Sequence, residues 1–218
     1  KPEDSSLSLR CLWLKALSGN DISSPVFDNG LSFDLLPPFF RKIVGRRLQS
    51  LYPRLHHANI EMRTAFIDKA VRDIISSLRS REGSAGDEAK RIRLVSMGAG
   101  YDVRSVKFIE QQAIDEAIEL DLPQVVKAKQ LLLGPKRLLR RRPWLKESDL
   151  PRLIDVDLNK VDDVRNILED VLMHGSESTW RTWHTIFVFE GVMIYLHEGV
   201  PSKLLDLCSS LLIKNELE

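Results

Sequence analysis

Cysteine is scarce in this chain, and so is net charge. The two cysteines, Cys11 and Cys208, lie far apart in the sequence, so the spacing of a zinc site or a redox dithiol is missing. We therefore expect no metal site and two reduced thiols in an intracellular, cytoplasmic protein. The formal net charge of +1 creates no overall field to attract nucleic acid, which excludes the strongly basic class of nucleic-acid binders.

Long apolar runs are missing as well. The leucine run 131–133 is followed by glycine, proline and lysine, so it is far too short to span a membrane. The 218 residues, of which 43% are hydrophobic and 29% charged, suit one globular domain with a substantial core. We expect a monomer without a membrane partner. Because the chain starts at Lys1 and stops at Glu218 directly after a helical pattern, we also expect a piece of a longer protein.

The spacing of apolar residues changes along the chain. Residues 1–20 have helical spacing and residues 27–45 are rich in proline and phenylalanine, which predicts an N-terminal helical lid or flap over residues 1–55. Residues 56–218 are the predicted core. It begins with a long helix at 56–80 and a turn or linker at 82–88. Predicted strands then lie at 91–97, 117–120, 153–156 and 185–189, and predicted helices at 103–112, 124–133, 161–174 and 201–213. This alternation predicts an α/β fold, with a doubly wound, mostly parallel sheet that carries helices on both faces.

Each predicted strand is followed by a residue type that suits a ligand site. Gly98 and Gly100 follow the first strand, Asp121 the second, Asp157 the third and Glu190 the fourth. Ligands bind open α/β sheets at the carboxyl ends of the strands, where these residues meet. An acid about 20 residues after a glycine turn can accept both hydroxyls of a ribose. The sequence therefore predicts a nucleoside pocket at this edge.

The glycine turn differs from that of a dinucleotide site. A third glycine is expected at position 103, which is Val103, and Asp102 would repel a pyrophosphate at the helix N-terminus. A cofactor without phosphate, with a cationic sulfonium and an amino group, tolerates such acids, and S-adenosylmethionine fits this description. An alternative stays open, since Asp121 and Asp157 also suit plain helix caps.

Six basic residues occur within residues 136–146. Such a run predicts a solvated helix end or loop, with an anion site as the less favoured alternative.

Four segments together resemble the leucine carboxyl methyltransferase family. They are V-S-M-G-A-G-Y-D-V-R at 95–104, E-L-D-L-P-Q-V-V-K-A-K at 119–129, D-V-D-L at 155–158 and I-F-V-F-E-G-V-M-I-Y-L at 186–196. Their order and spacing agree with the family over roughly residues 60–213, and four ordered motifs are far more specific than one. The resemblance implies a class I methyltransferase, Rossmann-like fold and S-adenosyl-L-methionine as methyl donor. The family continues beyond the fourth strand with three more strands, which are not in this chain.

By matching position, the resemblance also implies roles for individual residues. Arg63 would hold the methionine carboxylate of the cofactor, and Glu190 would face its ammonium group. The backbone at Gly98 and Gly100 would meet the cofactor, and Asp121 would hold its ribose. Asp157 and Leu158 would flank the adenine. Lys15 is a further candidate for a lid contact, and Val103 replaces the threonine usual in the family.

The implied reaction is methyl transfer to an oxygen of a protein or small-molecule acceptor. A carboxylate acceptor is already ionised near pH 7, so positioning and desolvation suffice and no general base is required. Glu190 and Tyr195 are the candidates for orienting the acceptor, and the five scattered histidines show no clear partner. Two alternatives remain: a non-catalytic or truncated methyltransferase-like protein, and an NAD-dependent oxidoreductase.

Overall fold

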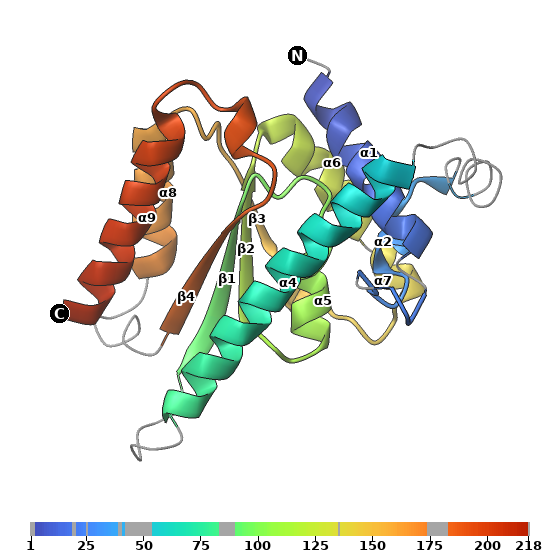
Figure 1. Ribbon diagram of the computed structural model, residues 1–218, viewed down its shortest axis with the longest axis horizontal. Helices are drawn as coiled ribbons and strands as arrows, with labels where there is room; N and C mark the ends of the chain where they lie inside the picture. Colours follow the sequence, from blue (N-terminus) through green and yellow to red (C-terminus); the bar gives the residue numbers. More distant parts are fainter. Residues whose placement is uncertain are drawn as a thin grey trace.

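The computed structural model describes residues 3–18, 21–24, 26–38, 41, 54–82, 90–134, 136–173 and 183–217. These residues form an α/β fold around one four-stranded sheet (Figure 1). The strands are β1 (Arg91–Met97), β2 (Glu116–Asp121), β3 (Arg152–Asp155) and β4 (Trp183–Phe189). All pairs are parallel, in the order β3-β2-β1-β4. This confirms the predicted fold class, and it places the carboxyl ends of all four strands at one edge.

Helices precede and separate the strands. They are α1 (Glu3–Ser18), α2 (Leu31–Leu35), α4 (Arg54–Glu82), α5 (Arg104–Glu110), α6 (Pro123–Leu133), α7 (Leu138–Arg141), α8 (Val161–Met173) and α9 (Val200–Leu217), with short 3₁₀ turns at Glu147–Asp149 and Met193–Tyr195. Pro123 opens α6, where its missing N–H costs nothing. No helix of the described residues is long and apolar enough to cross a membrane.

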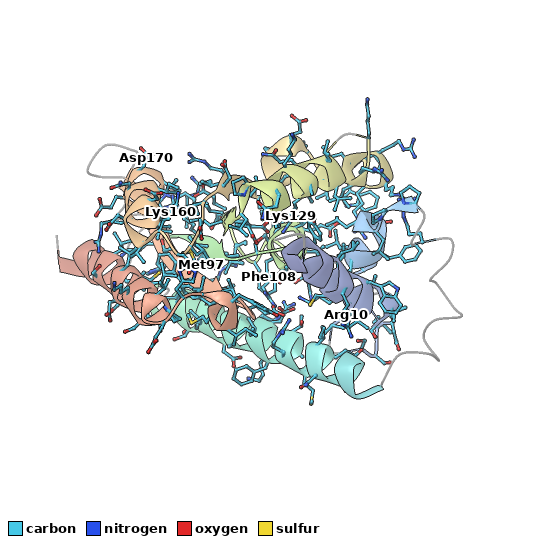
Figure 2. The ribbon with its side chains drawn as sticks, turned by 90° about the horizontal axis from the view of Figure 1, so that it is seen from above. Arg10, Met97, Phe108, Lys129, Lys160 and Asp170 are labelled. Carbon is cyan, nitrogen blue, oxygen red and sulfur yellow. The ribbon has the colours of Figure 1, made fainter. Side chains whose placement is uncertain are left out.

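Alternating side chains of the central strand face two separate helical layers. Val95 and Met97 of β1 pack among residues of α8 and α9, whereas Ile92 and Leu94 pack against α4 and α5. All four are buried, because β1 has a neighbouring strand on each side and helices above and below. In Figure 2, Met97 and Phe108 lie in the interior between the helices. The prediction of helices on both faces is therefore confirmed.

The N-terminal helix shares a core with the helices that cover the sheet. Leu12 and Leu14 of α1 are buried together with Val106 of α5 and Val125 of α6. Between residues 27 and 45, the described residues include α2 and further helical positions at Pro38 and Arg41, which agrees with the prediction of helical structure in this segment. The predicted linker at 82–88 lies outside the described residues after Glu82.

Two local predictions differ from the structure. The third strand ends at Asp155, so Asp157 lies two residues beyond it, in a turn. The basic run at 136–146 is not solvated throughout, because the Arg142 side chain is only 3% exposed. Its guanidinium donates to Asp34 at 3.0 Å and to Glu110 at 3.1 Å. A charge run alone does not reveal buried acids from distant segments, which is why the solvated interpretation is wrong for Arg142.

Candidate functional site

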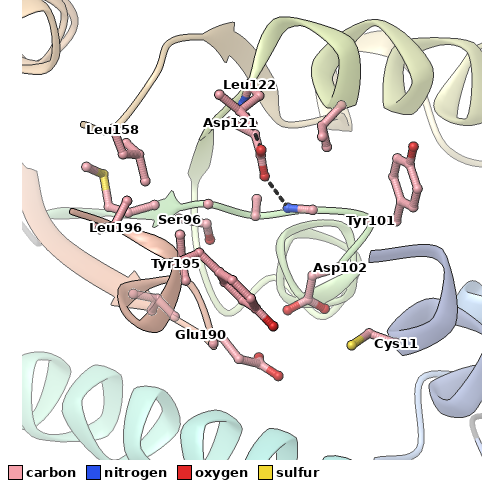
Figure 3. A pocket seen from close by; sticks show the side chains of 18 of the residues that line it. Cys11, Ser96, Tyr101, Asp102, Asp121, Leu122, Leu158, Glu190, Tyr195 and Leu196 are labelled. Atoms are coloured by element: carbon pink, nitrogen blue, oxygen red, sulfur yellow. Dashed lines mark hydrogen bonds between the residues drawn. The ribbon is translucent and has the colours of Figure 1, made fainter. Parts of the chain in front are cut away.

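A cavity of about 570 Å³ opens at the carboxyl edge of the sheet. This volume lies within the usual range for small-molecule sites. Its lining includes every residue that the sequence analysis selected: Arg63, Gly98, Gly100, Asp121, Asp157, Leu158, Glu190 and Tyr195. They come from α4 and from the segments after all four strands (Figure 3). The structure thus brings the predicted site residues together around one cavity.

The glycine turn after β1 forms one wall of the cavity. Gly98 and Gly100 have φ angles of +71° and +52°, in the region that glycine adopts at little cost. A Cβ atom at Gly98 would lie 2.4 Å from Cγ2 of Val192, in the loop that follows β4. Gly98 therefore lets two strand ends approach each other closely, which agrees with the prediction of a glycine turn after the first strand.

The acids after β2 and β3 line the cavity and also accept hydrogen bonds from nearby backbone. Oδ2 of Asp121 accepts from the Gly100 N–H at 2.6 Å, and Oδ1 accepts from the Leu122 N–H at 2.7 Å. Oδ1 of Asp157 accepts from both nitrogens of Asn159, at 3.0 and 3.1 Å. The helix-cap alternative is wrong for both acids, because the N-cap of α6 is Leu122, without a side-chain hydrogen bond, and α8 begins four residues after Asp157. Both carboxylates line the cavity.

Glu190, directly after β4, is surrounded by cations. Its Oε1 accepts from Arg63 Nε at 3.1 Å, from Thr64 Oγ1 at 3.2 Å and from Lys15 Nζ at 3.4 Å. Its Oε2 accepts from Arg104. These partners come from α1, α4 and α5, so three helices converge on one carboxylate. Lys15, a loose candidate from the sequence, is 5% exposed and also lies 3.2 Å from Asp102 Oδ1.

Arg104 is a site residue that the sequence analysis did not select. It ends the first matching segment, and its side chain is 3% exposed. Its guanidinium donates to Asp68 Oδ1 and Asp102 Oδ2, both at 2.6 Å, and to Glu190. Its place inside the first matching segment was a signal that could have selected it, whereas its partners Asp68 on α4 and Glu190 after β4 are distant in the sequence.

The charges near Glu190 nearly balance. Ion pairs join a set of five cations to four carboxylates: Lys15, Arg63, Arg104, Lys107 and Lys129 with Asp68, Asp102, Glu119 and Glu190. Within this set of described residues, the cations outnumber the carboxylates by one. The side chain of Arg63 is 42% exposed, whereas the other eight are at most 17% exposed. Arg63 is thus the cation of this set best placed to bind a further anion.

The pKa directions follow from this arrangement. Burial alone would raise the pKa of Asp102, but Arg104 and Lys15 lower it far below its usual value. Burial also works to raise the pKa of Glu190, as does Asp102, yet the positive charges of Lys15 and Arg104 leave it below its usual value. Both carboxyls are therefore ionised near neutral pH. Burial raises the pKa of Glu119, although Lys129 opposes this shift.

The remaining candidates lie at the rim or outside the described residues. Tyr195 is 57% exposed and lines the cavity from the 3₁₀ turn Met193–Tyr195. His197 also lines the cavity, and its backbone N–H donates to Asn159 at 2.8 Å. His174 and the side chains of His56 and His57 lie outside the described residues. No cluster of metal-binding side chains is present among the residues that the structure describes.

Comparison with known sequences agrees with this geometry. The profile of the leucine carboxyl methyltransferase family matches residues 41–209, which covers most of the chain and all cavity residues named above except Lys15. No match was found among curated proteins. Since the family profile spans well over half of the chain, and the segments it covers build one cavity at the strand ends, the chain belongs to the leucine carboxyl methyltransferase family.

Proposed function

We propose that this protein binds S-adenosyl-L-methionine in the cavity and transfers its methyl group to a carboxyl oxygen of a protein or small-molecule acceptor. The observation that carries the proposal is that one cavity has two chemically different ends. One end presents Asp121, Asp157 and Leu158, and the other presents Arg63 and Glu190. S-adenosylmethionine has a matching division into a nucleoside and a charged amino acid.

The nucleoside end fits an adenosine. The Asp121 carboxylate is an acceptor pair for the two ribose hydroxyls, at the usual distance in sequence from the glycine turn. Leu158 is 5% exposed and Val125 is 2% exposed, so apolar side chains are available to contact a planar base. Gly98 and Gly100 carry no side chain, so the backbone of the glycine turn lines the cavity directly.

The charged end fits an amino acid. Arg63 is the most exposed cation of this set, and a guanidinium binds a carboxylate through two parallel hydrogen bonds. Glu190 is ionised near neutral pH and supplies an acceptor for an ammonium group. The cavity is poorly suited to a dinucleotide. The ionised Asp102 carboxylate lies beside the glycine turn, where a pyrophosphate would need positive potential.

Methyl transfer to a carboxylate requires little acid–base catalysis from the protein. When bound, the cofactor supplies an electrophilic methyl group on a positively charged sulfur. A carboxylate acceptor is drawn to that positive charge and needs no deprotonation near pH 7, which favours it over a neutral hydroxyl. Tyr195 at the rim would orient the acceptor, while the surrounding side chains exclude water. The ionised Glu190 suits the ammonium group of the cofactor better than a second carboxylate.

Calorimetric titration with S-adenosylhomocysteine and with NAD tests the cofactor. We expect saturable binding of S-adenosylhomocysteine and none of NAD; dinucleotide binding without a response to S-adenosylhomocysteine would refute the proposal and favour an oxidoreductase.

Transfer of labelled methyl groups tests the reaction. Peptides with a free C-terminal carboxyl are compared with the same peptides amidated, and we expect base-labile methyl esters on the free forms alone. Cofactor binding without transfer to any carboxyl or hydroxyl acceptor would identify a non-catalytic member of the family instead.

A further inference from the structure

The Arg104 side chain joins three carboxylates that belong to three different parts of the fold. It donates from Nε to Asp68 on α4, from Nη1 to Asp102 in the turn after β1, and from Nη2 to Glu190 after β4. Only 3% of this side chain is exposed. A planar guanidinium can direct separate N–H groups at three acceptors in fixed directions, which a single ammonium group cannot do.

The contact with Asp68 extends the effect of Arg104 to α4. The second oxygen of Asp68 accepts from Lys107 at 2.9 Å, so α5 holds both oxygens of this carboxylate. Asp68 lies five residues after Arg63 on the same helix. Fixing Asp68 therefore fixes the part of α4 that presents Arg63 and Thr64 to Glu190.

We propose that Arg104 is a positioning residue, which holds the Glu190 carboxylate and the Arg63 segment of α4 in the arrangement that receives the amino-acid end of the cofactor. This inference rests on the proposed function and adds to it a residue that does not line the nucleoside end. Arg104 acts through Glu190, Asp102 and Asp68, all of which it contacts directly.

The electrostatics around Glu190 support this role. Lys15 from α1, Arg63 from α4, and Asp102 and Arg104 from the segment after β1 all face the carboxylate. Burial and the Asp102 charge both favour protonation of Glu190, and the cations oppose them. Removing the Arg104 charge would therefore raise the pKa of Glu190.

Two ligands separate positioning from a general effect on folding. S-adenosylhomocysteine carries the amino-acid group, and 5′-methylthioadenosine keeps the nucleoside but lacks that group. For Arg104→Lys we expect S-adenosylhomocysteine to bind about 10- to 100-fold more weakly, as for a lost hydrogen bond to a charged group, and methylthioadenosine to bind within about twofold of wild type.

Arg93→Lys is the matched control. Arg93 is also a buried arginine, 7% exposed and paired with Glu116 at 2.6 Å, but it does not line the cavity. We expect its affinities for both ligands to equal those of wild type. Equal losses for both ligands in Arg104→Lys, or no loss for either, would overturn the inference.

A titration of the ligand-free protein gives a second readout. The ¹³C carboxyl signal of Glu190, assigned with Glu190→Gln, is followed against pH in wild type and Arg104→Gln. We expect protonation at higher pH in Arg104→Gln, and an unchanged titration would overturn the inference.

This second readout reports whether Arg104 controls the Glu190 carboxylate even if wild type binds neither ligand, a result that would refute the proposed function. Should Arg104→Lys fail to fold, Asp68→Asn takes its place in the ligand comparison. Its expected result is the same selective loss for S-adenosylhomocysteine, and equal losses for both ligands would again overturn the inference.

Discussion

The two ends of the cavity are assembled in different ways. At the nucleoside end, Asp121 accepts hydrogen bonds from residues 1 and 21 positions away in the sequence. At the charged end, the partners of Glu190 lie 86 to 175 positions away. The first end is a local motif, a strand followed by a turn. The second exists only after α1, α4 and α5 have packed around the sheet, so its geometry depends on the whole fold.

This difference predicts different consequences when each end is changed. A buried ion pair contributes little net stability, but removing one member leaves an uncompensated charge and is costly. A backbone-bonded acid that faces a cavity is solvated more easily when a partner is lost. Changes at the charged end should therefore affect folding and binding together, whereas changes at the nucleoside end should affect mainly binding.

The largest expected effect is that of Glu190→Gln on stability. The Glu190 side chain is 9% exposed and neutralises cations that are themselves buried, so the free energy of unfolding should fall by about 3–5 kcal/mol. Urea denaturation of the ligand-free protein measures this change. Asp73→Asn is the control, since Asp73 pairs with Lys69 where the two side chains are 63% and 74% exposed, and its loss should cost about 1 kcal/mol or less. Similar losses in the free energy of unfolding would mean that the ion pairs of the charged end matter no more for stability than an exposed pair.

The next effect concerns the glycine turn that separates the two ends. Gly98→Ala should lower the free energy of unfolding by about 2–4 kcal/mol, because it adds a clash with Val192 to a left-handed backbone. Gly199→Ala introduces the same type of strain at φ +77°, with no atom within 4 Å of the new Cβ. Thermal and urea unfolding of both variants give the two losses in stability, and their difference is the cost of the clash with Val192. Equal costs would show that the approach of Val192 to Gly98 does not constrain the cavity wall.

A smaller effect is expected for Asp121→Ala, and it should appear in binding. Losing the acceptor of the ribose hydroxyls should weaken S-adenosylhomocysteine and methylthioadenosine alike, by about 10- to 100-fold. Calorimetry measures both affinities. The contrast with Arg104→Lys, which should affect one ligand only, is the sharpest test of the division into two ends. Unchanged affinities would remove Asp121 from the site.

The smallest effect is a pH dependence of stability that belongs to the charged end. In the folded protein the pKa of Glu190 lies below its usual value of 4.5, so its stabilising contribution is complete above that pH. The contribution is lost as the pH falls from about 4.5 through the lower folded pKa. Asp28 and Glu119, whose pKa values burial raises, change stability in the opposite direction. The measurement is therefore the difference between wild type and Glu190→Gln, which should shrink with acidification; a constant difference would contradict the pKa direction.

The comparison of the two ends also explains what the sequence could reveal. The four strands were located to within a few residues because apolar runs mark buried strands, and their order along the chain implied a parallel sheet. Gly98 and Asp121 were found because a turn motif has a fixed spacing. The ends of the strands are harder to predict. The third strand ends at Asp155, and its exposed end residues lack the apolar pattern that would mark its boundary.

The charged end was only partly predictable. Glu190 was recognisable from its place after a strand, but its binding by Lys15 and Arg104 joins residues that no local pattern connects. Arg142 shows the same limit, since its basic neighbours suggested solvent while Asp34 and Glu110 bind it in the interior. Periodicity reports which face of an element is buried; it does not report which distant charges meet there.

A crystal structure of the protein with S-adenosylhomocysteine tests the central claim most directly. The account predicts one ligand in the cavity, with its ribose hydroxyls in hydrogen-bond contact with Asp121 and its carboxylate in contact with Arg63. Binding outside this cavity, or in the reverse orientation with the carboxylate at Asp157, would contradict it.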